Sequence, residues 1–330
     1  LFDCTIEKYR RKELIEELTQ WIDVRPLPLA EWLVKRWFEE TTSATLAGMF
    51  KRLAEDPKSG MLEESFGKRI EGIGNTDREK EIIKNVLLPD SGPFCNESIV
   101  VSSEGSRLIL FMANVNQEAV SNSLFYLFRD KNTEYFYEKI KDKIRWNLSQ
   151  ALVKCCVRKE SFYKAACILG RFAEAENEDY SNNATGLFCQ FYHIFLPGTE
   201  ADFDQRIRVL FSLYREGNKF YPLIVKAINN AFLTHDFIKD GNTNKLGDIE
   251  ILDYKVKGNK DIVNYWEKCA NILKDLINDD SKTCNVIADM LAGHVRDFCW
   301  NGSIDILIDL MKFIKPHING DWLKMRDDIH

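Results

Sequence analysis

Cys189 and His193 come nearest to metal-binding chemistry in this sequence, because they lie four residues apart. In a predicted helix that spacing places both side chains on one face. A zinc ion takes four protein ligands, or three and a water molecule, so two side chains do not make a site. Their neighbours Phe188, Phe191 and Tyr192 are core-type aromatic residues. We therefore interpret the pair as part of a packed core and predict no metal site.

Paired carboxylates are a second pattern that resembles catalytic machinery. The pairs are Glu16-Glu17, Glu39-Glu40, Glu63-Glu64, Asp279-Asp280 and Asp327-Asp328. Adjacent side chains on a helix point in different directions, so such a pair does not converge on one substrate atom. Solvated helix faces and helix ends are the usual places for these charges.

Sequence motifs for phosphate binding and for nucleophilic or zinc catalysis are missing. The chain contains no GxxxxGK[ST], GxGxxG, GxSxG, HExxH or CxxC. Each of these motifs supplies a defined constellation, such as the backbone amides that cradle a phosphate. We therefore expect a chain that is not an enzyme and has no cofactor, with any nucleotide hydrolysis located outside it.

Composition narrows the class of partner. The chain has 330 residues, of which 45% are hydrophobic and 29% charged, and its net charge is −6. Nucleic-acid binding normally needs a net basic face, which this balance argues against. The expected partner is therefore another protein, or another domain of the same full-length chain, and the sequence leaves oligomerisation open.

Cellular location is inferred from the cysteines and from hydropathy. The nine cysteines are odd in number and lie mostly inside apolar helical runs. That usage is typical of a reducing compartment. No stretch approaches the ~18 consecutive apolar residues of a membrane span. We predict a cytoplasmic protein without a membrane partner, and the start at Leu1 suggests a piece excised from a longer chain.

The C-terminal two-thirds of the chain show apolar residues at helical spacing, in consecutive pairs of helices. The expected pairs are 144–157 with 162–174, 183–196 with 203–215, 220–233 with 262–277, and 284–300 with 304–314. A helical pair cannot bury its apolar stripe alone, so neighbouring pairs must stack. The period falls between those of tetratricopeptide and HEAT repeats. We therefore predict an all-α fold in which residues 116–330 form an α-solenoid of stacked helical hairpins (HEAT/TPR-like), with a helical bundle as the alternative.

Local signals mark two of the expected helix starts. Pro197 and Gly198 should end one helix, and Asp202 should cap the next by accepting backbone N–H bonds. Asn301 and Gly302 form a turn, after which Ser303 is the expected cap.

The third pair is interrupted by an insertion at residues 236–260 that is rich in Gly, Asn, Asp and Lys. Apolar residues alternate over 248–256, which predicts a short hairpin or an extended run. A loop of this length is usually either functional or disordered. The residues we single out here as candidates for partner binding are Lys239, Lys245, Tyr254 and Lys255.

The N-terminal residues 1–115 have a different pattern. Helical runs are expected at 6–22, 29–39, 44–54, 61–70 and 77–87. They are followed by the β-branched cluster Ile99-Val100-Val101, which we expect to be a wing or an edge strand. Short helices that end in such a segment are typical of a winged-helix-like unit. We therefore predict a small, mostly helical unit, winged-helix-like in character.

Three stretches of the chain carry a family resemblance. They are RPLPLAEWL from Arg25, NESIVVSSEGSRLILF from Asn96, and FLPGTEA from Phe195. Together they resemble the region after the ATPase core in large bacterial signal-transduction NTPases of the STAND class, including those of antiphage (antiviral) defence. The resemblance implies a winged-helix-like unit followed by a helical-repeat sensor. Because the nucleotide-binding motifs are missing, it assigns no functional residue.

These observations favour a sensor or protein-interaction module of a multidomain signalling protein. A helical-repeat enzyme that processes nucleic acid is the first alternative, and it would need a carboxylate in a basic groove. A regulator that binds DNA through its N-terminal unit is the second alternative.

Overall fold

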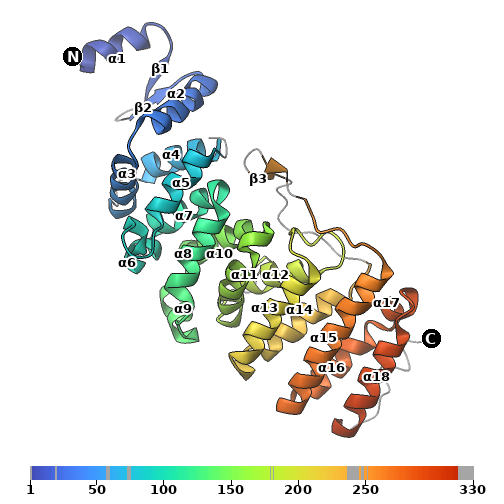
Figure 1. The fold of residues 1–330 in the computed structure, drawn as a ribbon. Coiled ribbons are helices and arrows are strands. Elements are labelled where there is room, and N and C mark those ends of the chain that lie inside the picture. The colour runs from blue at the N-terminus through green and yellow to red at the C-terminus, as the bar shows by residue number, and fades with distance from the viewer. Residues whose placement is uncertain are drawn as a thin grey trace. The chain divides into compact units, whose positions relative to one another are not determined.

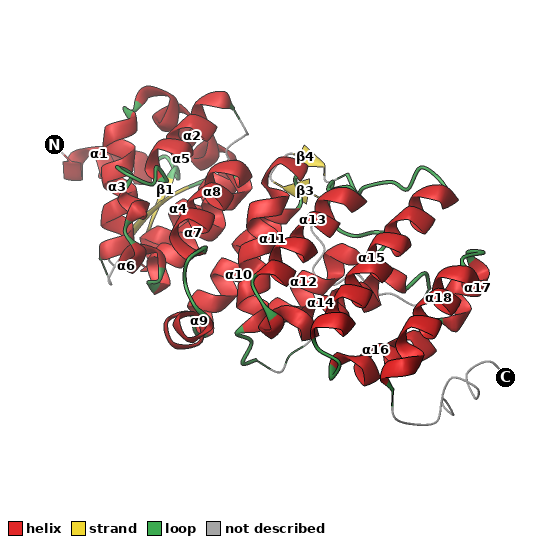
Figure 2. Ribbon diagram, turned by 60° about the horizontal axis from the view of Figure 1, so that its bottom comes forward, coloured by secondary structure: helices red, strands yellow, loops and turns green. Residues whose placement is uncertain are grey.

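The computed structural model describes residues 2–18, 21–56, 60–72, 76–178, 180, 182–235, 245–246, 249–250 and 252–318. Within these ranges the chain forms eighteen α-helices and four short strands, which pair into two two-stranded sheets. The all-α fold predicted from the sequence is therefore confirmed (Figure 2). The chain divides into two compact units between Ser123 and Leu124, inside helix α8 (Gln117–Phe128). The sequence had placed the boundary just before this helix.

The N-terminal unit opens with α1 (Phe2–Arg10) and an antiparallel hairpin of β1 (Ile15–Leu18) and β2 (Trp21–Val24), in which Ile15 pairs with Val24. The single helix predicted over residues 6–22 is wrong. Glu13 turns the chain with a positive φ of 56°. In β2 the β-branched Ile22 and Val24 alternate with Asp23, a pattern typical of a strand.

Four helices follow the hairpin close to the predicted positions. They are α2 (Leu27–Glu40), α3 (Ser43–Glu55), α4 (Gly60–Gly72) and α5 (Asp77–Val86). Next, a short 3₁₀ turn leads into α6 (Glu97–Val100). The Ile99–Val101 strand expected from its β-branched residues is therefore wrong, and no wing forms there. The Asn96 side chain accepts the Ser98 N–H at 3.0 Å and so caps the start of α6. The helix forms although the β-branched Ile99 and Val100 have poor helix propensity.

Helix α7 (Ser103–Val115) is the core of the N-terminal unit, and all its residues from Leu108 to Val115 are buried. It packs against α3, α4 and α5. Its approach to α4 is close: a Cβ added to Gly67 would lie 1.9 Å from the Phe111 ring. Only glycine fits at that crossing point.

The C-terminal unit contains the remaining helices. These are α9 (Thr133–Lys139), α10 (Asp142–Cys156), α11 (Lys159–Glu174), α12 (Ala184–Cys189), α13 (Phe203–Arg215), α14 (Tyr221–Phe232), α15 (Asn259–Asp279), α16 (Thr283–Ala292), α17 (Val295–Trp300) and α18 (Ile304–Ile314). Helices α10, α12, α14 and α16 pack in succession as one row, and α11, α13, α15 and α18 form the other (Figure 1). This two-row stacking is the predicted α-solenoid. None of the described helices is both long and apolar enough to cross a lipid bilayer.

Two expected helices of the solenoid are shorter than predicted. The helix expected over 183–196 ends at Cys189, continues as a 3₁₀ turn and stops at His193. The helix expected over 284–300 is divided at Gly293 and His294 into α16 and α17. Helix α9 was not predicted.

The predicted caps have different outcomes. Asp202 accepts the Gln205 N–H at 2.8 Å, and the Gln205 side chain returns a bond to the Asp202 N–H, so this cap is confirmed as a capping box. Ser303 accepts no capping hydrogen bond, and that prediction is wrong. In the insertion, β3 (Lys245–Leu246) and β4 (Ile249–Glu250) pair as a short hairpin that starts before the range predicted for it.

Candidate functional site

Two adjoining cavities lie along the row of α12, α14 and α16. Their volumes are about 730 Å³ and about 420 Å³. Both are lined by Thr185, Gly186 and Lys226, so they form one continuous depression, here called the α14 groove. Lys226 therefore stands near the middle of the groove and not at an end.

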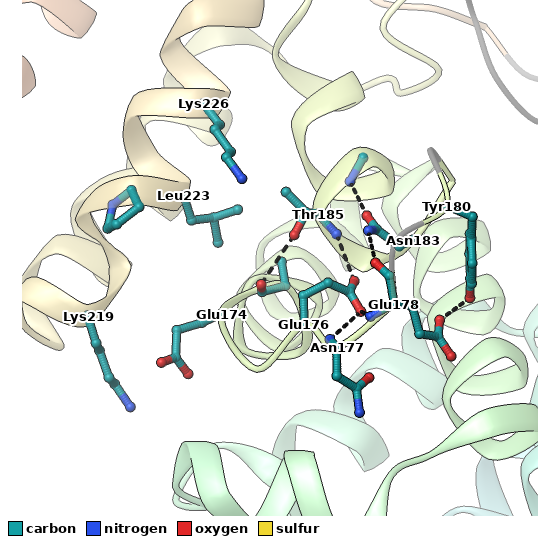
Figure 3. A pocket seen from close by; sticks show the side chains of 13 residues that line it. Glu174, Glu176, Asn177, Glu178, Tyr180, Asn183, Thr185, Lys219, Leu223 and Lys226 are labelled. Atoms are coloured by element: carbon teal, nitrogen blue, oxygen red, sulfur yellow. Dashed lines mark hydrogen bonds between the residues drawn. The ribbon is translucent and has the colours of Figure 1, made fainter. Parts of the chain in front are cut away.

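The larger cavity lies between the loop after α11 and the start of α14. Three acidic side chains line one side: Glu174 at the end of α11, and Glu176 and Glu178 in the loop after it. Lys219 and Lys226 come from the opposite side (Figure 3). The Lys219 Nζ donates to the Thr133 hydroxyl at 3.2 Å. The charges on the two sides are thus of opposite sign and nearly balanced.

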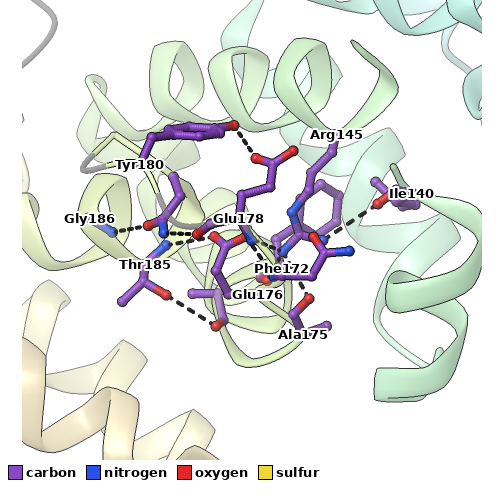
Figure 4. A network of polar contacts seen from close by, with 12 residues as sticks. Ile140, Arg145, Phe172, Ala175, Glu176, Glu178, Tyr180, Thr185 and Gly186 are labelled. Carbon is purple, nitrogen blue, oxygen red and sulfur yellow. Dashed lines mark hydrogen bonds and ion pairs between the residues drawn. The ribbon is translucent and has the colours of Figure 1, made fainter. Parts of the chain in front are cut away.

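The loop after α11, which lines this cavity, is held in place by a buried arginine. This residue is Arg145 of α10, which is only 1% exposed. Its Nη2 donates to the carbonyl oxygens of Phe172 and Ala175 at the end of α11, where helix carbonyls lack partners. The same atom lies 3.2 Å from the Glu176 carboxylate (Figure 4). Arg145 therefore joins α10 to the loop that lines the groove.

The Glu176 carboxylate accepts hydrogen bonds from the backbone of that loop and of the next helix. Its Oε1 accepts the backbone N–H groups of Asn177 and Glu178 at 3.0 and 3.2 Å. Its Oε2 accepts the Thr185 N–H at 3.3 Å, in the first turn of α12. Glu176 thus sets the position of two groove-lining backbone segments, the loop after α11 and the first turn of α12.

The smaller cavity has walls of different character. Val286 and Met290, one turn apart on α16, form an apolar wall, and Val286 is 58% exposed. Asn229 and Asn230 of α14 line the opposite side with their polar amides. A groove with an apolar wall and a few oriented polar groups is the usual form of a binding site.

The side-chain amide of each of these asparagines contacts a histidine ring on the protein side of the groove. The Asn229 Oδ1 lies 2.9 Å from the His294 Nε2. The Asn230 Nδ2 lies 3.3 Å from the His193 Nε2. Burial lowers the pKa of His193 and favours its neutral ring, whose Nε2 can accept the Asn230 N–H.

His294 is fixed in turn by Asp297, which is fully buried. The Asp297 Oδ2 lies 3.0 Å from the His294 Nδ1, and its Oδ1 accepts the Thr234 N–H at 2.9 Å and faces the His235 Nδ1 at 2.8 Å. Burial by itself raises the pKa of Asp297, but the hydrogen bonds from His294, Thr234 and His235 outweigh it and hold the pKa at about 2. The carboxylate is therefore ionised and orients the imidazole.

A histidine oriented by a carboxylate is also the base of a hydrolase triad. Here the second ring nitrogen of His294 faces the Asn229 amide and not a hydroxyl or thiol, and the ring is only 3% exposed. The arrangement positions an amide in a groove. It is suited to binding, not to proton transfer.

Of the predicted partner-binding residues, the two that the structure describes fully, Tyr254 and Lys255, do not line the groove. Lys239 lies outside the described residues, as does the side chain of Lys245, which belongs to β3. The Tyr254 N–H donates to the Thr199 carbonyl at 2.7 Å, and its ring packs on the Phe203 ring. Lys255 is exposed beside it.

The cysteine and histidine first considered for a metal both lie at the smaller cavity. Cys189 is a lining residue, and His193 lies behind Asn230. In the part of the chain that the structure describes, no group of three or more His, Cys, Asp or Glu side chains could hold a metal.

Sequence reasoning missed the asparagines. Asn229 and Asn230 are polar residues within α14, whose other residues from Leu223 onward are apolar apart from Lys226. That interruption of an apolar helix was the available signal.

Comparison with protein-family models, curated proteins and solved structures gave no significant match to this chain. The fold and the groove nevertheless define a class: an α-solenoid with a polar groove along one row of its helices.

Proposed function

We propose that this chain is a non-catalytic protein-interaction module, and that the α14 groove is its docking surface. The observation that favours the proposal most is that buried side chains hold the groove-lining groups in place. Arg145 with Glu176, His294 and His193 each fix a lining group from the protein side. Lining groups that are already ordered reduce the entropy lost when a partner binds.

The charge of the groove favours a protein partner over a nucleic acid. A phosphate backbone would meet Glu174, Glu176 and Glu178 together with Lys219 and Lys226. Nucleic-acid grooves are instead dominated by basic side chains that release counterions. A peptide, with its mixed donors and acceptors, is the better complement.

The biological setting is part of the same proposal. From the resemblance to STAND-class NTPases, we propose that the solenoid is a sensor in a larger cytoplasmic defence or signalling protein. Its partner would be another protein or another domain of the same full-length chain.

The test is a display screen of random peptides, with labelled single- and double-stranded DNA measured in parallel at low salt. Val286→Arg places a long charged side chain on the apolar wall of the groove. Ile308→Arg on α18 is the matched control, since Ile308 is also exposed but does not line the groove. We expect selected peptides to bind wild type and Ile308→Arg alike, and Val286→Arg about tenfold more weakly, as for loss of an apolar contact.

Equal binding of the peptides to both variants would place the docking surface elsewhere. DNA binding at low salt that exceeds that of every peptide would favour the nucleic-acid alternatives, because phosphate contacts are strongest there.

A further inference from the structure

Lys226 supplies a cation near the middle of the groove. Lys219 bonds to Thr133, and Arg145 is paired with Glu176. Lys226 is exposed, and the structure gives it no hydrogen bond or ion pair to any described residue. An unpaired ammonium group in the middle of a groove offers a place for one negative charge.

The two asparagines present complementary atoms beside it. Both ring nitrogens of His294 face oxygen acceptors, the Asp297 carboxylate and the Asn229 Oδ1, so Nε2 donates to Asn229 and the Asn229 Nδ2 donor is left over. Because Asn230 uses its Nδ2 toward His193, its Oδ1 acceptor is left over. Neither remaining atom has a hydrogen bond to a described residue. One donor beside one acceptor matches the C=O and the N–H of a peptide group.

The spacing relates these features to an extended chain. Lys226 and Asn230 are four residues apart on α14, which is about 6 Å along a helix axis. An extended peptide advances about 3.3 Å per residue, so the negative charge should lie about two residues from the recognised peptide group. Val286 and Met290 on the facing helix would then contact an aliphatic side chain of the same segment.

We infer that the α14 groove binds an extended peptide segment that carries an acidic side chain at Lys226, a peptide group at Asn229 and Asn230, and an aliphatic side chain at Val286 and Met290. This inference rests on the proposed function and specifies its partner. The negative charge is assigned to an acidic side chain because the groove continues on both sides of Lys226, so a bound chain can pass through.

The experiment measures fluorescence polarisation of labelled peptides of about nine residues, long enough to span both cavities when extended. The peptides are acetylated and amidated, and carry one Glu and one Leu at varied separations in a Gly/Ser/Ala background. We expect Glu→Gln in the peptide to weaken binding about tenfold, as does Lys226→Glu in the protein, because an ion pair is lost in a partly desolvated site. Lys312→Glu on α18 is the control of equal charge change and should bind as wild type.

Backbone recognition is tested without changing the protein. Peptides N-methylated at successive positions keep their side chains but lose one N–H each, and one position should lose about tenfold in affinity because the Asn230 acceptor is left unpaired. Asn230→Ala should weaken the unmethylated peptide and make that methylated position neutral.

The outcomes separate the two proposals. Display-selected peptides that require Val286 but are indifferent to Lys226→Glu and to their own acidic residues would overturn this inference and leave the docking function in place. A strong preference for peptides with a free C-terminal carboxylate would also overturn it, since the charge would then be a chain end. Failure of every peptide to bind would remove the docking function as well.

Discussion

The side-chain oxygen of Asn229 lies 2.9 Å from the Nε2 of His294, a residue 65 positions further along the chain. The contact joins α14 to the break between α16 and α17, where His294 also meets the buried Asp297. The orientation of one groove amide therefore depends on a carboxylate that never reaches the groove.

Asp297→Asn should lower the stability of the C-terminal unit at neutral pH. It should also make that stability less sensitive to a fall in pH. The pKa of Asp297 is held at about 2, below its ordinary value of 3.8, so its stabilising contribution is present above pH 3.8 and is lost as pH falls through about 2. The expected difference is about 2 kcal/mol at neutral pH, from the size of this shift. Urea unfolding at pH 7 and at about pH 2 measures it. Asp305→Asn, at an exposed site on α18, should change neither value.

Arg145→Met should destabilise the C-terminal unit by about 3 kcal/mol, because it leaves the Glu176 carboxylate and two helix-end carbonyls without their donor. Arg158→Met is the matched control, since Arg158 pairs with Glu200 at 2.7 Å but is one-third exposed. It should cost less than about 1 kcal/mol. Equal losses in urea unfolding would mean that the buried ion pair does not hold the loop.

Glu63 of α4 should make the N-terminal unit less stable as pH rises. Burial raises its pKa from 4.5 to about 7, although the nearby Arg107 lowers it, and neither carboxylate oxygen accepts a hydrogen bond from a described residue. The protonated form is favoured in the fold, so the stabilisation is full below pH 4.5 and is lost as pH passes about 7.

Glu63→Gln removes this titration. Above about pH 8 the variant should exceed wild type by up to roughly 3 kcal/mol, the free energy that corresponds to the shift. The check is a series of thermal unfolding curves between acidic and alkaline pH. If stability changed with pH in the same way for the two proteins, the pKa of Glu63 would not be raised by folding and the prediction would be wrong.

Gly67→Ala should cost about 2 kcal/mol or more, because its Cβ would overlap the Phe111 ring in a packed core. Gly48→Ala in α3 is the control, since nothing lies within 4 Å of the added Cβ. It should stabilise by up to about 1 kcal/mol through helix propensity. Denaturant midpoints of the two variants should therefore move in opposite directions.

The helices that could be predicted are those in which apolar spacing and local caps agree. Asp202 and Gln205 form their capping box within four residues, so a local reading finds it. Ile99 and Val100 have strand-type side chains, yet the caps at Asn96 and Ser102 and the burial of both residues make them helical. Tertiary context overrode propensity there.

The groove could not be predicted from the sequence in the same way. Asn230 has a visible position on α14, but its partner His193 belongs to another repeat, 37 residues away. Arg145 and Glu176 are likewise distant in sequence and meet only when α10 packs on α11. Periodicity identifies which faces of helices are buried, but it does not identify which polar side chains meet across them.

The most direct test of the docking surface is hydrogen exchange of the full chain with and without a display-selected peptide. The α14 groove should gain protection, so exchange should slow in α12, α14 and α16 and stay unchanged in α13 and α18. Protection confined to the row of α11, α13, α15 and α18, or to the backbone around Tyr254 and Lys255, would contradict the assignment of the groove as the docking surface.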